Sequence, residues 1–151
     1  MNKLTQKLLF LFVLCVAAVS LMGASFILKV AERNVIATAL AADFSAGHVK
    51  IWSGSAPGVE NAATGTLLVD WTLNATNNST NGVTTLGTVA NVNASATNTA
   101  GYFRITKADG TTAVAEGDVG TSAASLVLNT LSIVSDGPCS LSGTVTVPAG
   151  T

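Results

Sequence analysis

The chain has 151 residues and a formal net charge of −1, a length that suits one domain of ordinary size with an appended segment. The charge is uneven: after residue 33, three basic residues stand against seven acidic ones, which leaves the body of the chain at −4. An acidic body repels phosphate backbones, so nucleic acid is not expected as a partner.

An uncharged apolar segment lies between Lys7 and Lys29. It is long enough to span a bilayer as a helix, which needs about 20 apolar residues. It also has the order of a secretory signal, because Lys3 and Lys7 precede a stretch rich in leucine, phenylalanine and valine. Residues 1–24 are therefore expected to be a signal-like or transmembrane-like segment, unless translation starts at Met22 and the segment before it is not made.

Residues 25–46 are predicted to form a helix at the start of the soluble body. Ser25 can cap its N-terminus. The apolar spacing predicts an amphipathic helix with Ile27, Ala31, Val35 and Ala39 on one face. The helix is expected to end near Ser45-Ala46-Gly47, where glycine adopts the left-handed C-cap conformation.

Residues 47–151 are predicted to form a β-sandwich domain, because apolar and polar residues alternate in several short runs. In HVKIWSG, Val49 and Ile51 are expected on one face and His48, Lys50 and Trp52 on the other. The same alternation in TLLVDWTL and GYFRITK predicts an apolar face of Leu67, Val69, Trp71, Leu73, Phe103 and Ile105, opposed by a polar face of Thr66, Asp70, Thr72, Tyr102, Arg104 and Thr106.

Turn signals separate these runs. They are the Gly54–Gly58 stretch, the polar loop from Asn74 to Gly82, the Asp109-Gly110 hairpin signal and Asp136-Gly137-Pro138. Further strands are expected around residues 83–92, 114–119, 126–133 and 139–147. Seven or eight short strands at regular spacing predict a mostly β fold, an antiparallel sandwich of immunoglobulin-like or jelly-roll-like type with an N-terminal helix.

Residues able to carry catalysis are few and scattered. His48 is the single histidine of the chain, so a Ser-His-Asp or Cys-His site has one possible base, and no acid neighbours it in sequence. An enzyme would need a cleft that joins residues far apart, such as His48 and Asp70. We therefore expect no enzyme activity and no catalytic or cofactor-binding residues.

Metal and sugar sites are also not expected. Cys15 and Cys139 are too few for a disulfide framework, and one histidine with one cysteine in the body is too few for the common zinc sites. The acids near the predicted hairpin lack calcium-loop spacing: Asp109, Glu116 and Asp118. Four aromatic residues could form a sugar-binding platform, but packing within the domain is their commoner use: Trp52, Trp71, Tyr102 and Phe103.

Several segments follow one another from Val30 to Thr151: AERNVIATAL, KIWSG with a proline after it, GTLLVDWTL, an Ala/Thr-rich middle, AGYFRIT, DGTT, GDVGTS, LVLNTLSIVSDG and TVTVPAG. In this order they resemble a family of small virion-associated proteins of tailed bacteriophages and prophages. The resemblance implies a structural particle component, a capsid decoration or another head or tail accessory, assembled in the host cytoplasm. Its expected partners are a capsid or tail lattice and copies of itself. Members of the family usually begin at a position like Met22.

The N-terminal segment supports a second interpretation. If residues 1–24 are cleaved or embedded, the chain is an exported or membrane-anchored bacterial surface or adhesion module, and it contacts a membrane only where the segment is retained. The threonine-rich outer strand faces fit both interpretations, because β-branched hydroxyl side chains suit a pleated surface without adding charge.

Overall fold

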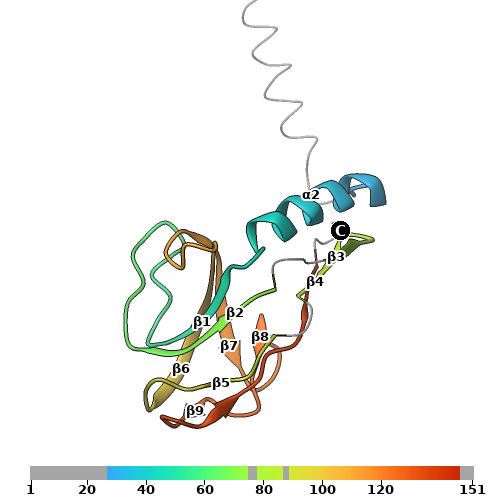
Figure 1. Cartoon of the computed structure of the whole chain (residues 1–151). Coiled ribbons are helices and arrows are strands. Elements are labelled where there is room, and N and C mark those ends of the chain that lie inside the picture. Colours follow the sequence, from blue (N-terminus) through green and yellow to red (C-terminus); the bar gives the residue numbers. More distant parts are fainter. Residues whose placement is uncertain (1–26, 75–77, 87–88, 147–151) are drawn as a thin grey trace, which may run out of the picture.

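A computed structural model describes residues 27–74, 78–86 and 89–146 (Figure 1). The chain is mostly β with one N-terminal helix, and its curled, largely antiparallel sheets form a β-sandwich-like fold, as predicted. The apolar segment 1–24 lies outside the described residues. Within those residues, no helix combines the length and the hydrophobicity that a membrane crossing requires.

The main sheet has six strands, in the order β2-β1-β6-β7-β8 with β9 paired to the start of β6. All pairs are antiparallel except β7 with β8, which is parallel. The bounds are β1 (His48–Ser53), β2 (Leu67–Thr72), β6 (Asn98–Thr106), β7 (Ala113–Gly120), β8 (Leu126–Val127) and β9 (Ser132–Ile133).

Two smaller sheets complete the β structure. One has the order β11-β4-β3 and the other pairs β10 with β5. Their bounds are β3 (Asn78–Thr80), β4 (Val83–Thr85), β5 (Val92–Asn93), β10 (Pro138–Cys139) and β11 (Thr144–Thr146). The described residues thus contain eleven strands rather than seven or eight, because several expected runs divide into pieces of two or three residues.

The hairpin β3–β4 occupies part of the segment that was predicted to be a polar loop. Thr80 and Val83 are paired, so Asn81 and Gly82 form a two-residue turn. Both have positive φ, 55° and 76°, as the turn of a tight hairpin requires. The Asn-Gly pair therefore forms the turn of a hairpin here, although the residues around it are polar.

The core lies against the apolar face of the main sheet. Val49, Ile51 and Ile105 are buried there as the alternation predicted, together with Trp71. They pack with apolar residues from the connections of the smaller sheets: Leu86, Val89, Ala94 and Leu141. The Trp71 indole also donates a hydrogen bond of 3.2 Å to the carbonyl of Cys139, which ties β2 to β10. The thiol of Cys139 is half-buried, and this burial raises its pKa.

Helix α2 (Val30–Asp43) packs on β3 and β4 at one end of the sheets (Figure 1). The prediction of its apolar face was wrong: Ala31, Val35 and Ala39 are exposed, while Ala37 and Ala41 are buried. The small side chains at 37 and 41 let the helix approach the hairpin closely. Lys29 is the N-cap and makes no side-chain cap bond, and Ser25 lies outside the described residues.

The end of α2 also differs from expectation. The helix ends at Asp43 with Phe44 as C-cap, and the left-handed residue is Ala46, with φ of 54°, rather than Gly47. Gly47 serves another purpose, because a Cβ there would lie 2.3 Å from the carbonyl oxygen of Thr106. Glycine is needed at this position for the close approach of two backbones.

Candidate functional site

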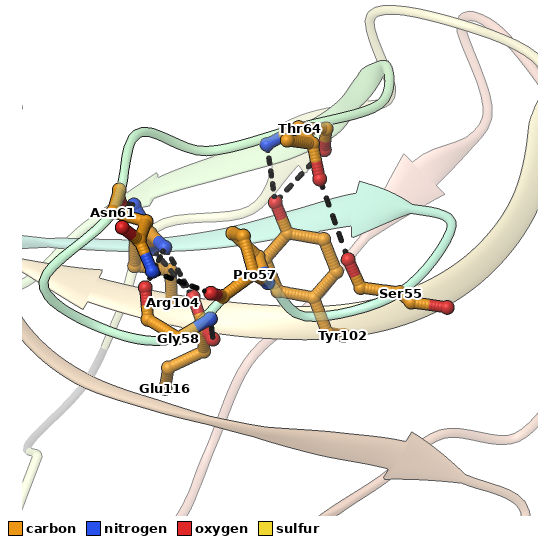
Figure 2. Close-up of polar contacts among 8 residues, drawn as sticks. All are labelled: Ser55, Pro57, Gly58, Asn61, Thr64, Tyr102, Arg104 and Glu116. Carbon is orange, nitrogen blue, oxygen red and sulfur yellow. Dashed lines mark hydrogen bonds and ion pairs between the residues drawn. The ribbon is translucent and has the colours of Figure 1, made fainter.

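The second face of the main sheet is polar, as predicted, but much of it is buried. Lys50 pairs with Arg104 and Trp52 with Tyr102, so these side chains share one face. Tyr102 is 0% and Arg104 5% exposed. They are covered by residues 54–66, which connect β1 to β2 and which we name the anchored loop (Figure 2).

Tyr102 is the first anchor of this loop. Its hydroxyl donates to the carbonyl of Thr64 at 2.8 Å and accepts from the amide of Thr64 at 2.9 Å. The Thr64 hydroxyl in turn donates to the carbonyl of Ser55 at 3.3 Å, across the base of the loop (Figure 2). A single buried phenol therefore satisfies both backbone groups of one loop residue.

Arg104 is the second anchor. Its guanidinium forms an ion pair with Glu116 on the neighbouring strand, and both side chains are nearly buried, at 6% and 7% exposure. The same group donates to the carbonyls of Asn61 at 2.9 Å and Gly58 at 3.2 Å, and Glu116 accepts from the Gly58 amide at 2.8 Å (Figure 2). Charge-assisted hydrogen bonds of this kind are the strong ones in proteins. The ion pair therefore fixes the loop as well as the two strands.

A second charged group joins β1 and β2 beside the loop. Asp70 Oδ1 lies 2.8 Å from His48 Nδ1, and Asp70 Oδ2 lies 3.5 Å from Lys50 Nζ. Lys50 also donates to the carbonyl of Gly110 at 2.7 Å. The structure thus brings together the histidine and the acid that an enzyme would have needed. Among the hydrogen bonds of the described residues, none joins Nε2 of His48 to a hydroxyl or a thiol.

The turn between β6 and β7 borders this group. Its hairpin signal, Asp109-Gly110, is confirmed: Gly110 has a positive φ of 70°. Asp109 accepts from the amides of Thr111 and Thr112, both at 2.8 Å, and from the Thr112 hydroxyl at 2.5 Å. These hydrogen bonds, the one from the Thr112 hydroxyl first, lower the pKa of Asp109. The turn is therefore held by its own carboxylate.

The acids near this turn do not gather around one point. Glu116 binds Arg104, and the Asp118 carboxylate accepts from the hydroxyl of Ser125 and then from its amide, which lowers the pKa of Asp118. In the part of the chain that the structure describes, no group of three or more histidine, cysteine or acidic side chains is placed to hold a metal ion.

A pocket of about 570 Å³ lies between the anchored loop and the β6–β7 turn. Its wall includes Lys50, Trp52, Arg104 and Thr106 from the polar face of the sheet. Two buried polar atoms there have no hydrogen-bond partner among the described residues: Nε1 of Trp52 and Oγ1 of Thr106. Sequence reasoning missed this pocket, because the residues that close it lie in loops without any motif.

The four aromatic residues do not form one platform. Pairing places Phe103 opposite Ile51 and Trp71 opposite Val49, on the apolar face. Tyr102 is fully buried under the anchored loop, and Trp52 alone contributes to the pocket. Phe103, Trp71 and Tyr102 thus pack within the domain, whereas Trp52 lies in the wall of the pocket.

No protein-family model matches the chain, and neither a characterised protein nor a solved structure is significantly similar to it.

Two buried threonines provide a matched test of the hydrogen bonding described above. Thr84 is 0% exposed and donates to the carbonyl of Ala37 at 2.9 Å, whereas Thr106 is 2% exposed and its hydroxyl has no partner in the part of the chain that the structure describes. Thr84→Val is expected to lower the free energy of unfolding by about 1–2 kcal/mol, while Thr106→Val leaves it unchanged or raises it by up to about 1 kcal/mol. Urea unfolding measures both, and equal losses would mean that the Thr106 hydroxyl has a partner.

Proposed function

We propose that this protein is a non-enzymatic structural component of a bacteriophage particle, a capsid decoration or another head or tail accessory that binds a protein lattice. The observation that carries the proposal is the apolar outer surface at α2. Four large apolar side chains of this helix and of the residues just before it are exposed, and Val35 among them lies on the outer face of the helix: Ile27 by 67%, Val30 by 45%, Val35 by 66% and Ile36 by 40%.

This surface has the composition of a docking face. Exposed alanines lie beside Val35 on the same face of the helix: Ala31, Ala39 and Ala42. Figure 1 shows α2 across one end of the sheets, with its outer side directed away from them. Soluble monomers rarely leave extended apolar patches uncovered, and such patches mark binding surfaces. Burial of such a surface against a partner contributes a stabilising free energy of roughly 25 cal/mol per Å² of apolar area.

The anchored loop supports a binding role rather than a reaction. Its backbone is held at Gly58, Asn61 and Thr64 by buried side chains, so the loop is a fixed part of the domain. The His48–Asp70 pair lacks a hydrogen-bonded nucleophile among the described residues and ties two strands together instead. Both features favour a rigid display surface.

The exported or membrane-anchored surface module is the second candidate, and the apolar sequence of residues 1–24 favours it. N-terminal sequencing and intact mass of the native protein separate the two. A start at Met22 supports the particle protein. A processed start near Ala24 or Ser25, or an intact Met1 in the membrane fraction, supports the surface module.

Val35→Glu tests the particle role. The substitution places a charge on the docking face, at a side chain that is 66% exposed, so we expect an unchanged melting temperature and loss of the protein from purified particles of the phage or prophage that carries the gene. Quantitative mass spectrometry of the particles measures this. Asn129→Glu, at another exposed position, is the control and is expected to be incorporated normally. Absence of the wild-type protein from particles, or full incorporation of Val35→Glu, would contradict the proposal.

A further inference from the structure

The turn of the hairpin β3–β4 is the one Asn-Gly pair in the sequence, Asn81-Gly82. This dipeptide is prone to deamidation, because glycine has no Cβ to hinder attack of its backbone nitrogen on the asparagine side chain. In that reaction the Gly82 nitrogen forms a bond to Cγ of Asn81, the bond from Cγ to Nδ2 breaks, and ammonia leaves with the amide proton. Water then opens the succinimide ring to aspartate or isoaspartate. The Asn81 side chain is exposed, so solvent reaches it.

The attacking nitrogen of this reaction is held by another element. Helix α2 supplies Asn34, whose Oδ1 accepts a hydrogen bond of 2.7 Å from the Gly82 amide. Gly82 is buried, whereas Asn81 beside it is exposed. The amide nitrogen attacks only after it gives up its proton, and the bond to Asn34 engages that proton. A hydrogen bond donated by the neutral amide also disfavours the negative charge that the nitrogen would carry.

The backbone of the turn opposes the reaction as well. Asn81 and Gly82 have positive φ of 55° and 76°, and the pairing of Thr80 with Val83 closes the hairpin around them. Ring closure requires the peptide between Asn81 and Gly82 to rotate until its nitrogen faces Cγ. Because α2 packs on both β3 and β4, Asn34 is carried by a fixed element, and its hydrogen bond resists this rotation.

We propose that the Asn81-Gly82 turn is a deamidation site and that Asn34 protects it. The product carries a negative charge at position 81, and isoaspartate also adds an atom to the backbone, which a two-residue turn does not accommodate. Since α2 packs on this hairpin, deamidation would loosen the helix that carries the docking face at Val35. The assignment depends on the geometry of the hairpin alone and is independent of the particle role, so either can fail without the other.

The test follows conversion of Asn81 in the full-length protein during incubation at mildly alkaline pH, by peptide mapping with mass spectrometry. Asn34→Leu keeps nearly the volume of asparagine and removes the acceptor. We expect it to convert Asn81 about three- to tenfold faster than the wild type does, the rate equivalent of one net hydrogen bond. Asn34→Asp is the matched control, because its carboxylate still accepts from the Gly82 amide, and it is expected to convert no faster than the wild type.

Two further variants make the outcome specific. Thr38→Leu places the same leucine at an exposed position of α2 and is expected to convert at the wild-type rate. Asn81→Gly added to Asn34→Leu should abolish the conversion without straining the turn, because glycine accepts the positive φ at this position. The proposal is overturned if Asn34→Leu converts no faster than the wild type, if Asn81 stays intact in both, or if Asn34→Asp or Thr38→Leu accelerates the reaction as much as Asn34→Leu does.

Discussion

Replacing Arg104 by methionine is expected to lower the free energy of unfolding by about 3–5 kcal/mol, because it leaves the buried carboxylate of Glu116 without its partner. The substitution also removes the donors to the carbonyls of Gly58 and Asn61. The substitution is therefore expected to loosen the anchored loop locally, in addition to destabilising the whole domain. Hydrogen exchange at the amides of residues 57–64 is expected to accelerate more than exchange in the core strands.

Denaturant unfolding of matched variants measures this effect. Lys107→Met breaks an ion pair with Asp43 whose side chains are 47% and 44% exposed, and its loss is expected to be much smaller because water already screens that pair. The double variant Arg104→Met with Glu116→Leu should recover part of the lost stability, since the stranded charge is gone. A loss no larger than that of Lys107→Met would contradict the description of the anchored loop.

The sequence predicted the face of the sheet on which Arg104 lies, but not all of the contacts that its guanidinium makes. Alternation in GYFRITK correctly put Arg104 on the polar face with Tyr102 and Thr106. The proximity of Arg104 to Glu116 could be predicted as well, because a hairpin at Asp109-Gly110 places residue 104 close to residue 116 on the next strand. The contacts of Arg104 with the loop carbonyls could not be predicted, since they depend on the path of a loop that contains no periodic pattern.

The helix and the short strands show a second limit. In α2, apolar residues four positions apart occur on more than one face, because alanines are so frequent. Packing on β3 and β4 decides which face is buried, and it buries Ala37 and Ala41. The face with Val35 is left outside. Strands of two residues, such as β8 and β10, carry no periodicity and form through pairing with distant segments. The pocket depends on the same long-range placement.

Gly101→Ala is expected to cost about 3 kcal/mol of unfolding free energy, because the added methyl meets backbone rather than a movable side chain. Gly101 is the extra residue of a bulge in β6, between the pairs Trp52–Tyr102 and Ser53–Ala100. A Cβ there would lie 1.8 Å from the carbonyl oxygen of Gly54, where the anchored loop leaves β1. The bulge and the loop thus depend on one another.

Gly143→Ala is the matched control for this bulge. It adds the same methyl at a glycine that has no left-handed φ and, among the described residues, no atom within 4 Å of the new Cβ, so stability should stay constant or rise by up to about 1 kcal/mol. Urea midpoints with unchanged m-values compare the two variants. Because Gly101 supports the start of the loop and Arg104 its middle, Gly101→Ala should also accelerate amide exchange near Gly58. Similar stabilities of the two alanine variants would mean that the loop is not seated on β6 at this point.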